Sequence, residues 1–232
     1  MDVDDVAPGA VLDDGRSVRQ VLRALRVFDA ELPGFDPGAA PDEPVALFLD
    51  WLQRAVAGGV REPHAMTLCT VDGSGRPSGR VLICKDVTVD GGWLFASSAS
   101  SRKGRELAAH PEAALGFHWP EQGRQVQVRG TATSCGPRRS AEDFLARPEA
   151  SRIEGLVARQ SQVLEDPADL PVALEAAQDR ILADPGAVAP AWTLYALAAR
   201  EVEFWQADRE RRHVRLQYLR AGDRWTRRRL WP

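Results

Sequence analysis

The spacing of apolar residues predicts two helices in the first quarter of the chain. In the segment SVRQVLRALRVF (17–28), Val18, Val21 and Leu25 recur at helical spacing behind Ser17, a residue type that caps helices. A proline-rich linker follows, and a second helix starts near Pro44, because proline is tolerated in a first helical turn. Its expected apolar face is Val45, Phe48, Leu49, Leu52 and Val56, and Gly58-Gly59 ends it.

The rest of the chain alternates in the manner of β-strands. We expect strands at 65–71, 80–87, 93–97, 113–119, 124–133, 192–199, 201–206, 211–219 and 224–230, with a hairpin between the first two. A short helix is expected at 101–110, and a helical, polar segment at 140–183, interrupted by Pro148, Pro167 and Pro171. Strands joined in this way predict a closed or nearly closed antiparallel β-barrel with helices outside. We assign 1–41 to an N-terminal arm and linker and 42–232 to the barrel domain.

Composition excludes several classes of protein. No run approaches 18 consecutive apolar residues, which argues against a membrane-spanning helix, and the absence of a secretory signal predicts a cytoplasmic protein. Cys69 and Cys84 lie in apolar runs and are expected to be small buried hydrophobic residues. With Cys135 they are widely spaced, and the four histidines form no cluster, so we expect no metal site.

Positive charge is concentrated near the C-terminus. The net charge is −3, yet Arg209 to Arg229 holds nine arginines against two acids. Such a segment is compatible with nucleic-acid binding, with a phosphate site or with a solvated face. The arginines lack an interleaved array of aromatic residues, so we expect no nucleic-acid partner.

Two pairs of cations lie where a barrel would favour apolar residues or where a helix starts. Arg80 and Lys85 are separated by an odd number of positions, so a site using both must lie at a strand end or a subunit boundary. Arg102-Lys103 falls at a helix N-terminus, where an anion would relieve the repulsion. A phosphate cradle and a solvated turn both fit this second pair.

A third group follows Trp205, which fits equally a core position and a ring-stacking platform. Arg211, His213 and Arg215 alternate, so an extended chain would place all three on one face. They indicate either an anion site or a solvent-facing edge strand.

Taken in order, several segments resemble the pyridoxamine 5′-phosphate oxidase family. They are EPHAMTLCTVDGSGRPSGRVLICKDV, SRKGRELAAHPEAALGFHW, RQVQVRG, RPEASR, ARQS, EVEFWQADRERRHVRLQY and WTRRRLWP, which span roughly 42–232. The resemblance implies a split antiparallel β-barrel with peripheral helices, working as a homodimer with flavin mononucleotide (FMN) at the subunit interface.

The same resemblance implies which residues form the site. Residues matching the family's FMN contacts are Arg80, Val81, Leu82, Lys85, Ala96, Ser97, Arg102, Lys103, Gln125, Gln160, Ser161, Trp205 and Arg215. Residues matching its substrate contacts are Lys85, Arg147, Ser151, Arg211 and His213, of which Arg211 and His213 would lie nearest the reacting carbon and are the expected catalytic pair.

The chain departs from the family pattern on the substrate side. Asp143 replaces a tyrosine, Thr193-Leu194 replaces a glycine pair, and Val214 replaces an aspartate. Ala96-Ser97 replaces a Tyr-Thr pair that meets the flavin. An anion at position 143 would repel a substrate phosphate. The phosphate site for FMN is retained, and the pattern is similar to the phenazine-biosynthesis branch.

These features predict an FMN-dependent oxidase that takes a hydride from a small reduced ring substrate, of the phenazine type or another secondary-metabolite precursor, and passes electrons to O2. One alternative is a pyridoxine/pyridoxamine 5′-phosphate oxidase that makes pyridoxal 5′-phosphate. A second alternative is a flavin-binding protein without turnover.

Overall fold

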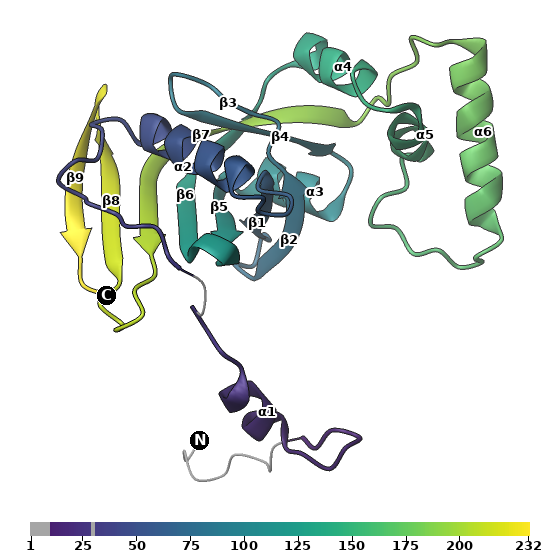
Figure 1. Cartoon of the computed structure of the whole chain (residues 1–232). Coiled ribbons are helices and arrows are strands. Elements are labelled where there is room, and N and C mark those ends of the chain that lie inside the picture. Colours follow the sequence, from purple (N-terminus) through teal and green to yellow (C-terminus); the bar gives the residue numbers. More distant parts are fainter. Residues whose placement is uncertain (1–9, 29–30) are drawn as a thin grey trace.

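The computed structural model describes residues 10–28 and 31–232, and nine strands of this part form one antiparallel sheet. The main path runs β2-β1-β5-β6-β7-β4-β3, and β8 and β9 branch from β7. The sheet curls into a half-barrel that brings β2 near β4 (Figure 1). The strands are β1 (Ala65–Val71), β2 (Pro77–Ile83), β3 (Asp86–Val87), β4 (Gly92–Ser98), β5 (Glu112–Trp119), β6 (Arg124–Ser134), β7 (Trp192–Gln206), β8 (Val214–Ala221) and β9 (Arg224–Leu230). The predicted split antiparallel barrel with peripheral helices is confirmed.

The branch point of the sheet is the long strand β7. One edge of β7 pairs with β6 along its length, while the other pairs first with β4 and then with β8. A register shift between Arg129 and Gly130, opposite Arg200, lies where the partner changes. Two separate strands were expected here at 192–199 and 201–206. That prediction was wrong, because a bulge lets one strand bend without ending.

The predicted hairpin is confirmed, but its second strand is displaced. Strand β2 begins at Pro77 and ends at Ile83, whereas we expected 80–87. The chain then leaves the sheet, and Lys85 N donates to the carbonyl oxygen of Leu94 at 2.7 Å before the short strand β3. Lys85 therefore lies beyond the strand end, as a site shared with Arg80 requires.

The core lies inside the curl and under α2. Helix α2 begins at Pro44 and stops at Gly58, as predicted, but its buried face is centred on Phe48, Trp51 and Ala55. Leu49 and Val56, which we placed on that face, are exposed because the helix is rotated toward Trp51. The prediction for Cys69 was also wrong, since its side chain lies on the outer, exposed face of β1. Cys84 is half-buried, and burial raises the pKa of its thiol to about 12.

The remaining helices lie around the sheet. They are α1 (Val18–Ala24), α3 (Arg102–Ala109), α4 (Pro137–Leu145), α5 (Glu149–Val157) and α6 (Asp169–Ala183), with α2 spanning Pro44–Ala57 and a 3-10 turn at Pro120–Gln122. Pro148 precedes α5 as expected, whereas Pro171 sits in the first turn of α6 and does not interrupt it.

The first helix, α1, lies apart from the sheet in Figure 1. Ser17 caps α1 in a capping box with Gln20, as its residue type predicts. The helix ends at Ala24 and not at residue 28, because it buries no side chain and a short unpacked helix is marginal in water. Residues 1–9 and 29–30 of the predicted arm lie outside the described residues.

Candidate functional site

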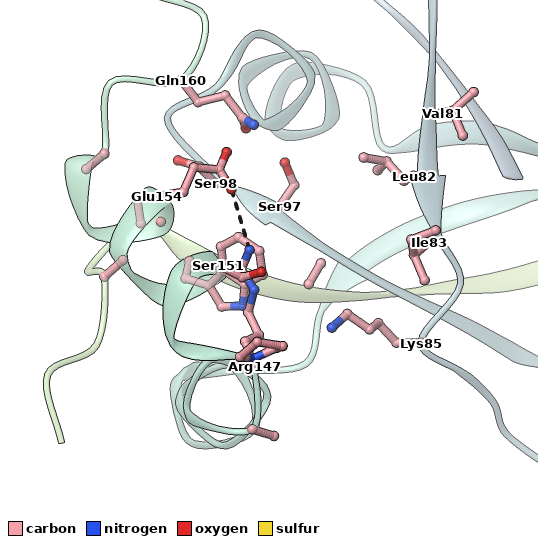
Figure 2. Close-up of a pocket in the computed structure, with 18 residues that line it drawn as sticks. Val81, Leu82, Ile83, Lys85, Ser97, Ser98, Arg147, Ser151, Glu154 and Gln160 are labelled. Atoms are coloured by element: carbon pink, nitrogen blue, oxygen red, sulfur yellow. Dashed lines mark ion pairs between the residues drawn. The ribbon is translucent and has the colours of Figure 1, made fainter. Parts of the chain in front are cut away.

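A cavity of about 460 Å³ lies where the curled sheet nearly closes. Strands β2 and β4 form one wall and α5 the other, and Figure 2 shows Lys85 and Arg147 at one end of the cavity and Gln160 at the opposite end. Eight of the residues named from the sequence line this cavity: Val81, Leu82, Lys85, Ala96, Ser97, Arg147, Ser151 and Gln160.

The lower end of the cavity in Figure 2 contains Lys85 and Arg147. Lys85 Nζ lies 3.3 Å from Asp143 Oδ1, and Trp192 Nε1 donates to Asp143 Oδ2 at 2.8 Å. The guanidinium of Arg147 stacks on the Trp192 ring, 4.0 Å from its centre. Asp143 therefore acts here as the partner of Lys85 and Trp192, a role that could not be predicted from its residue type alone.

The opposite end adjoins the start of α3. Lys103 is buried, and its Nζ donates to Gln160 Oε1 at 3.0 Å and to Ser101 Oγ at 3.4 Å. The backbone N–H of Arg102 donates to Ser161 Oγ at 3.1 Å. These contacts bring Arg102, Lys103, Gln160 and Ser161 together, although the two pairs are far apart in the sequence.

The sequence around α3 explains this close packing. Ser101 caps the helix by accepting from the N–H of Gly104. A Cβ at position 104 would lie 2.4 Å from the carbonyl oxygen of Ala99, so only glycine lets the helix start against the preceding turn. The helix N-terminus and both basic side chains are thereby fixed beside Gln160.

Arg80 joins this end through Glu106, which the sequence analysis missed. Its guanidinium donates to Glu106 Oε2 at 3.2 Å and to Ser78 Oγ at 2.6 Å, and Arg102 Nε donates to Glu106 Oε1 at 2.8 Å. Burial opposes ionisation of Glu106, but hydrogen bonds from Thr70, Ser78 and the two arginines outweigh it and lower its pKa to about 2. The i,i+4 spacing from Arg102 to Glu106 on one helix could have indicated this ion pair from the sequence.

We call Arg80, Arg102, Lys103 and Glu106 the phosphate cradle. Three cations and one carboxylate leave an excess of two positive charges, the number that a phosphate dianion would neutralise. Burial and the neighbouring Arg80 lower the pKa of Lys103, so the protein groups around it disfavour its charge. The donor set fits the phosphate of a mononucleotide.

The other predicted residues form a second cluster at the far end of β7. Gln125, Trp205 and Arg215 lie side by side on β6, β7 and β8. Arg215 Nε donates to Glu203 Oε1 at 2.8 Å, and this bond raises the pKa of Arg215. The cluster is Gln125, Trp205, Arg211, His213 and Arg215, and we call it the β7–β8 cluster.

Arg211 and His213 do not share a strand face with Arg215, as an extended chain would require. Strand β8 begins only at Val214, and Arg211 lies in a turn with φ +66°. Asp208 Oδ1 holds this turn by accepting the N–H groups of Glu210 and Arg212. The edge-strand alternative is also wrong, because β8 is paired on both sides.

His213 is oriented by its surroundings. Its Nδ1 accepts the backbone N–H of Asp208 at 3.0 Å, and its ring centre lies 4.8 Å from that of Trp205. The neutral ring therefore carries its proton on Nε2. Phe28 of the arm packs on both rings, at 5.7 Å from His213 and 6.0 Å from Trp205, a contact for which the sequence offered no signal.

Within one chain, the cavity and the β7–β8 cluster lie far apart. Trp192 lines the cavity, while Trp205 belongs to the β7–β8 cluster. They stand on the same strand, 13 residues apart by their numbers, which corresponds to roughly 40 Å at 3.3 Å per residue. The fold and site thus define a split-barrel protein with a small-ligand cavity and a separate cluster of expected site residues.

Comparison with known proteins identifies the family. Residues 52–206 match the model described as pyridoxamine 5′-phosphate oxidase, and residues 192–232 match the pyridoxine 5′-phosphate oxidase C-terminal dimerisation region. The chain belongs to the pyridoxamine 5′-phosphate oxidase family. Within the described residues, no helix has the length and apolar character needed to cross a bilayer.

Relatives carry two different names. A pyridoxine/pyridoxamine 5′-phosphate oxidase of Ectopseudomonas mendocina is 40% identical over 86% of this chain and 93% of its own length. The corresponding protein of Thermosynechococcus vestitus is 41% identical over 83% and 90%. PhzG from Burkholderia lata, solved with tetrahydrophenazine-1-carboxylic acid, superposes with a TM-score of 0.78 at 32% identity, over 87% of this chain and 99% of its own.

Proposed function

We propose that this protein is an FMN-dependent oxidase that works as a homodimer and acts on a small reduced ring compound. The observation that carries the proposal is the phosphate cradle with its two excess positive charges, which adjoins a 460 Å³ cavity through the hydrogen bond from Lys103 to Gln160. Family membership and the matched dimerisation region support it.

In this proposal the cradle binds the FMN phosphate. Arg80 and Arg102 are held by Glu106, so their positions are set before the ligand arrives and little ordering entropy is lost on binding. The phosphate dianion restores a favourable environment for the charge on buried Lys103. Bound FMN would supply a ring that accepts a hydride from the substrate and passes the electrons to O2.

The β7–β8 cluster would come from the partner subunit. Because it lies roughly 40 Å along β7 from the cavity, one chain cannot offer both groups to one flavin. His213 accepts the Asp208 N–H at Nδ1, so its free Nε2–H donates to the substrate and orients it. Arg211, held in the same turn, supplies a cation beside it.

The substrate we favour is a reduced phenazine-type compound. The solved relative PhzG binds such a compound, and Asp143 makes the substrate end unlike a phosphate site. The second candidate is pyridoxine or pyridoxamine 5′-phosphate, favoured by relatives of that name at 40% and 41% identity. With either substrate, Lys85, Arg147 and Ser151 would be residues that contact it.

Oxygen consumption tests the proposal. The FMN-loaded protein should oxidise a tetrahydrophenazine carboxylate at a rate well above that with pyridoxine 5′-phosphate. A higher rate with the vitamin phosphate would establish the second candidate. A flavin-loaded protein that turns over neither compound would favour the alternative of a flavin-binding protein without turnover.

Subunit mixing tests the shared site. Lys103→Met and His213→Ala homodimers should each be inactive, because each lacks one half of both sites. Randomly mixed dimers should regain about a quarter of wild-type activity, since half are heterodimers with one intact site of two. Mixed dimers that stay inactive after confirmed subunit exchange would show that both halves act within one chain.

A further inference from the structure

We propose that Asp143 sets the charge of the substrate, so that the cavity accepts a ring compound with one carboxylate and rejects a phosphate dianion. The proposal rests on the function proposed above and names the substrate class for the same cavity. It assigns to Asp143 the role of a specificity-determining residue.

Asp143 is a fixed negative charge at the substrate end. Its side chain is only 12% exposed, one carboxylate oxygen pairs with Lys85 at 3.3 Å, and the other accepts from the Trp192 indole at 2.8 Å. The indole bond prevents the carboxylate from turning away when an anion enters. The charge of Lys85 is therefore already balanced before any substrate binds.

Arg147 is the cation that remains for a ligand. It stacks on Trp192 at 4.0 Å, its side chain is 13% exposed, and its Nη1 is buried without a hydrogen-bond partner in the structure. A buried guanidinium N–H without an acceptor is costly, and a ligand oxygen would supply one. Its ion-pair neighbour Glu154 lies 3.8 Å away and is 69% exposed, so water screens that charge.

Charge then decides between the two ligand types. Lys85 and Arg147 face Asp143 and Glu154, which gives this end a net charge of zero. A monocarboxylate adds one negative charge beside Arg147, whereas a phosphate dianion adds two near the largely shielded carboxylate of Asp143. At about 4 Å with water-like screening, each unit of charge against Asp143 corresponds to about a fivefold change in affinity, and burial increases it.

The test is a titration of the FMN-loaded protein, followed by the visible absorbance of the flavin. Pyridoxine 5′-phosphate is the dianionic probe and phenazine-1-carboxylate the monoanionic one. Asp143→Asn removes the charge and keeps an oxygen acceptor for Trp192. It should tighten binding of the phosphate about 25-fold and of the carboxylate about fivefold, so the preference shifts about fivefold toward phosphate.

Two further variants separate charge from geometry. Glu142→Gln removes a charge from the neighbouring position of α4, where Glu142 is exposed and pairs with Arg138, and should leave the preference unchanged. Lys85→Met combined with Asp143→Asn restores a net charge of zero and should return the preference to within about twofold of the wild type.

A preference that stays constant in flavin-loaded Asp143→Asn protein, or that moves equally in Glu142→Gln, would overturn the role of Asp143. Probes that leave the flavin spectrum unchanged in both the wild type and Asp143→Asn would overturn it as well. Wild-type protein that fails to bind FMN would instead contradict the proposed function. The two failures are therefore distinguishable.

Discussion

The substrate end of the cavity and the phosphate cradle, which adjoins the other end, are built from the same kinds of residues but differ in charge. At the phosphate cradle, Glu106 holds two arginines and leaves Lys103 unbalanced, which gives an excess of two positive charges. At the substrate end, Asp143 and Glu154 balance Lys85 and Arg147. A carboxylate thus serves opposite purposes at the two places.

The difference follows from how many cations surround each carboxylate. Glu106 accepts from both Arg80 and Arg102, so it positions two positive charges while cancelling only one. Asp143 pairs with one lysine, and its other oxygen accepts a hydrogen bond from a neutral indole. It therefore cancels the charge of Lys85, its only ion-pair partner in the described residues. An anion site therefore depends on the local sum of charges more than on the presence of basic residues.

The largest effect is expected from Lys103→Met. This change removes the buried cation of the cradle and should weaken FMN binding by about 30- to 150-fold, since a charge-assisted hydrogen bond to a buried phosphate is worth about 2–3 kcal/mol. Fluorescence titration with FMN measures it. Riboflavin, which lacks the phosphate, should bind both proteins with similar affinity, and Arg105→Met on the exposed side of α3 should leave FMN affinity unchanged. Equal losses for FMN and riboflavin would show that Lys103 supports the fold and not the phosphate.

The next effect concerns stability at the cradle. Glu106→Gln should lower the free energy of unfolding of the FMN-free protein by about 2–3 kcal/mol, because the two arginines lose their buried counter-charge. Urea denaturation at pH 7 measures the difference, and Glu142→Gln on exposed α4 is the matched control. A loss no larger than that of the control would mean that the cradle is held together by its neutral hydrogen bonds.

Glu106 also makes the free energy of unfolding depend on pH, and the direction of that dependence can be predicted. The pKa of Glu106 is about 2 in the folded protein and near 4.5 in the unfolded chain, so the unfolded state binds the extra proton between these values. The stabilisation is complete above about pH 4.5 and is lost as the pH falls toward 2. The Glu106→Gln protein should therefore lose less stability than the wild type between pH 5 and pH 3.

Patterns that repeat along the chain allowed most of the fold to be predicted. Ser17, Pro44, Gly58 and Ser101 mark helix ends where the structure has them, because capping is a local property of sequence. The rotation of α2 was missed because Trp51 is buried by tertiary packing, which overrides the spacing that favoured Leu49 and Val56. The bulge that keeps β7 continuous depends on its partners and has no signal in β7 alone.

The family resemblance named the residues of the candidate site, but their arrangement could not be predicted. Eight expected residues do line one cavity, since the motif order follows the fold. The turn at Arg211 depends on the Asp208 carboxylate and not on alternation, so extended geometry failed there. The pairing of Asp143 with Trp192 joins residues 49 positions apart, a distance over which a single sequence carries no pairing information.

The smallest effect is expected at Glu154, and it tests why the substrate end is neutral. Glu154 contributes a formal charge equal to that of Asp143, but its side chain is 69% exposed and lies 3.8 Å from Arg147, whereas that of Asp143 is 12% exposed. Because solvent screens the exposed carboxylate, Glu154→Gln should tighten binding of pyridoxine 5′-phosphate by about threefold or less, against about 25-fold for Asp143→Asn. The same flavin absorbance titration compares the two variants directly. Equal gains in affinity for the two variants would mean that solvent exposure of the carboxylate has no effect at the substrate end. The difference between this end and the cradle would then depend only on the number of formal charges.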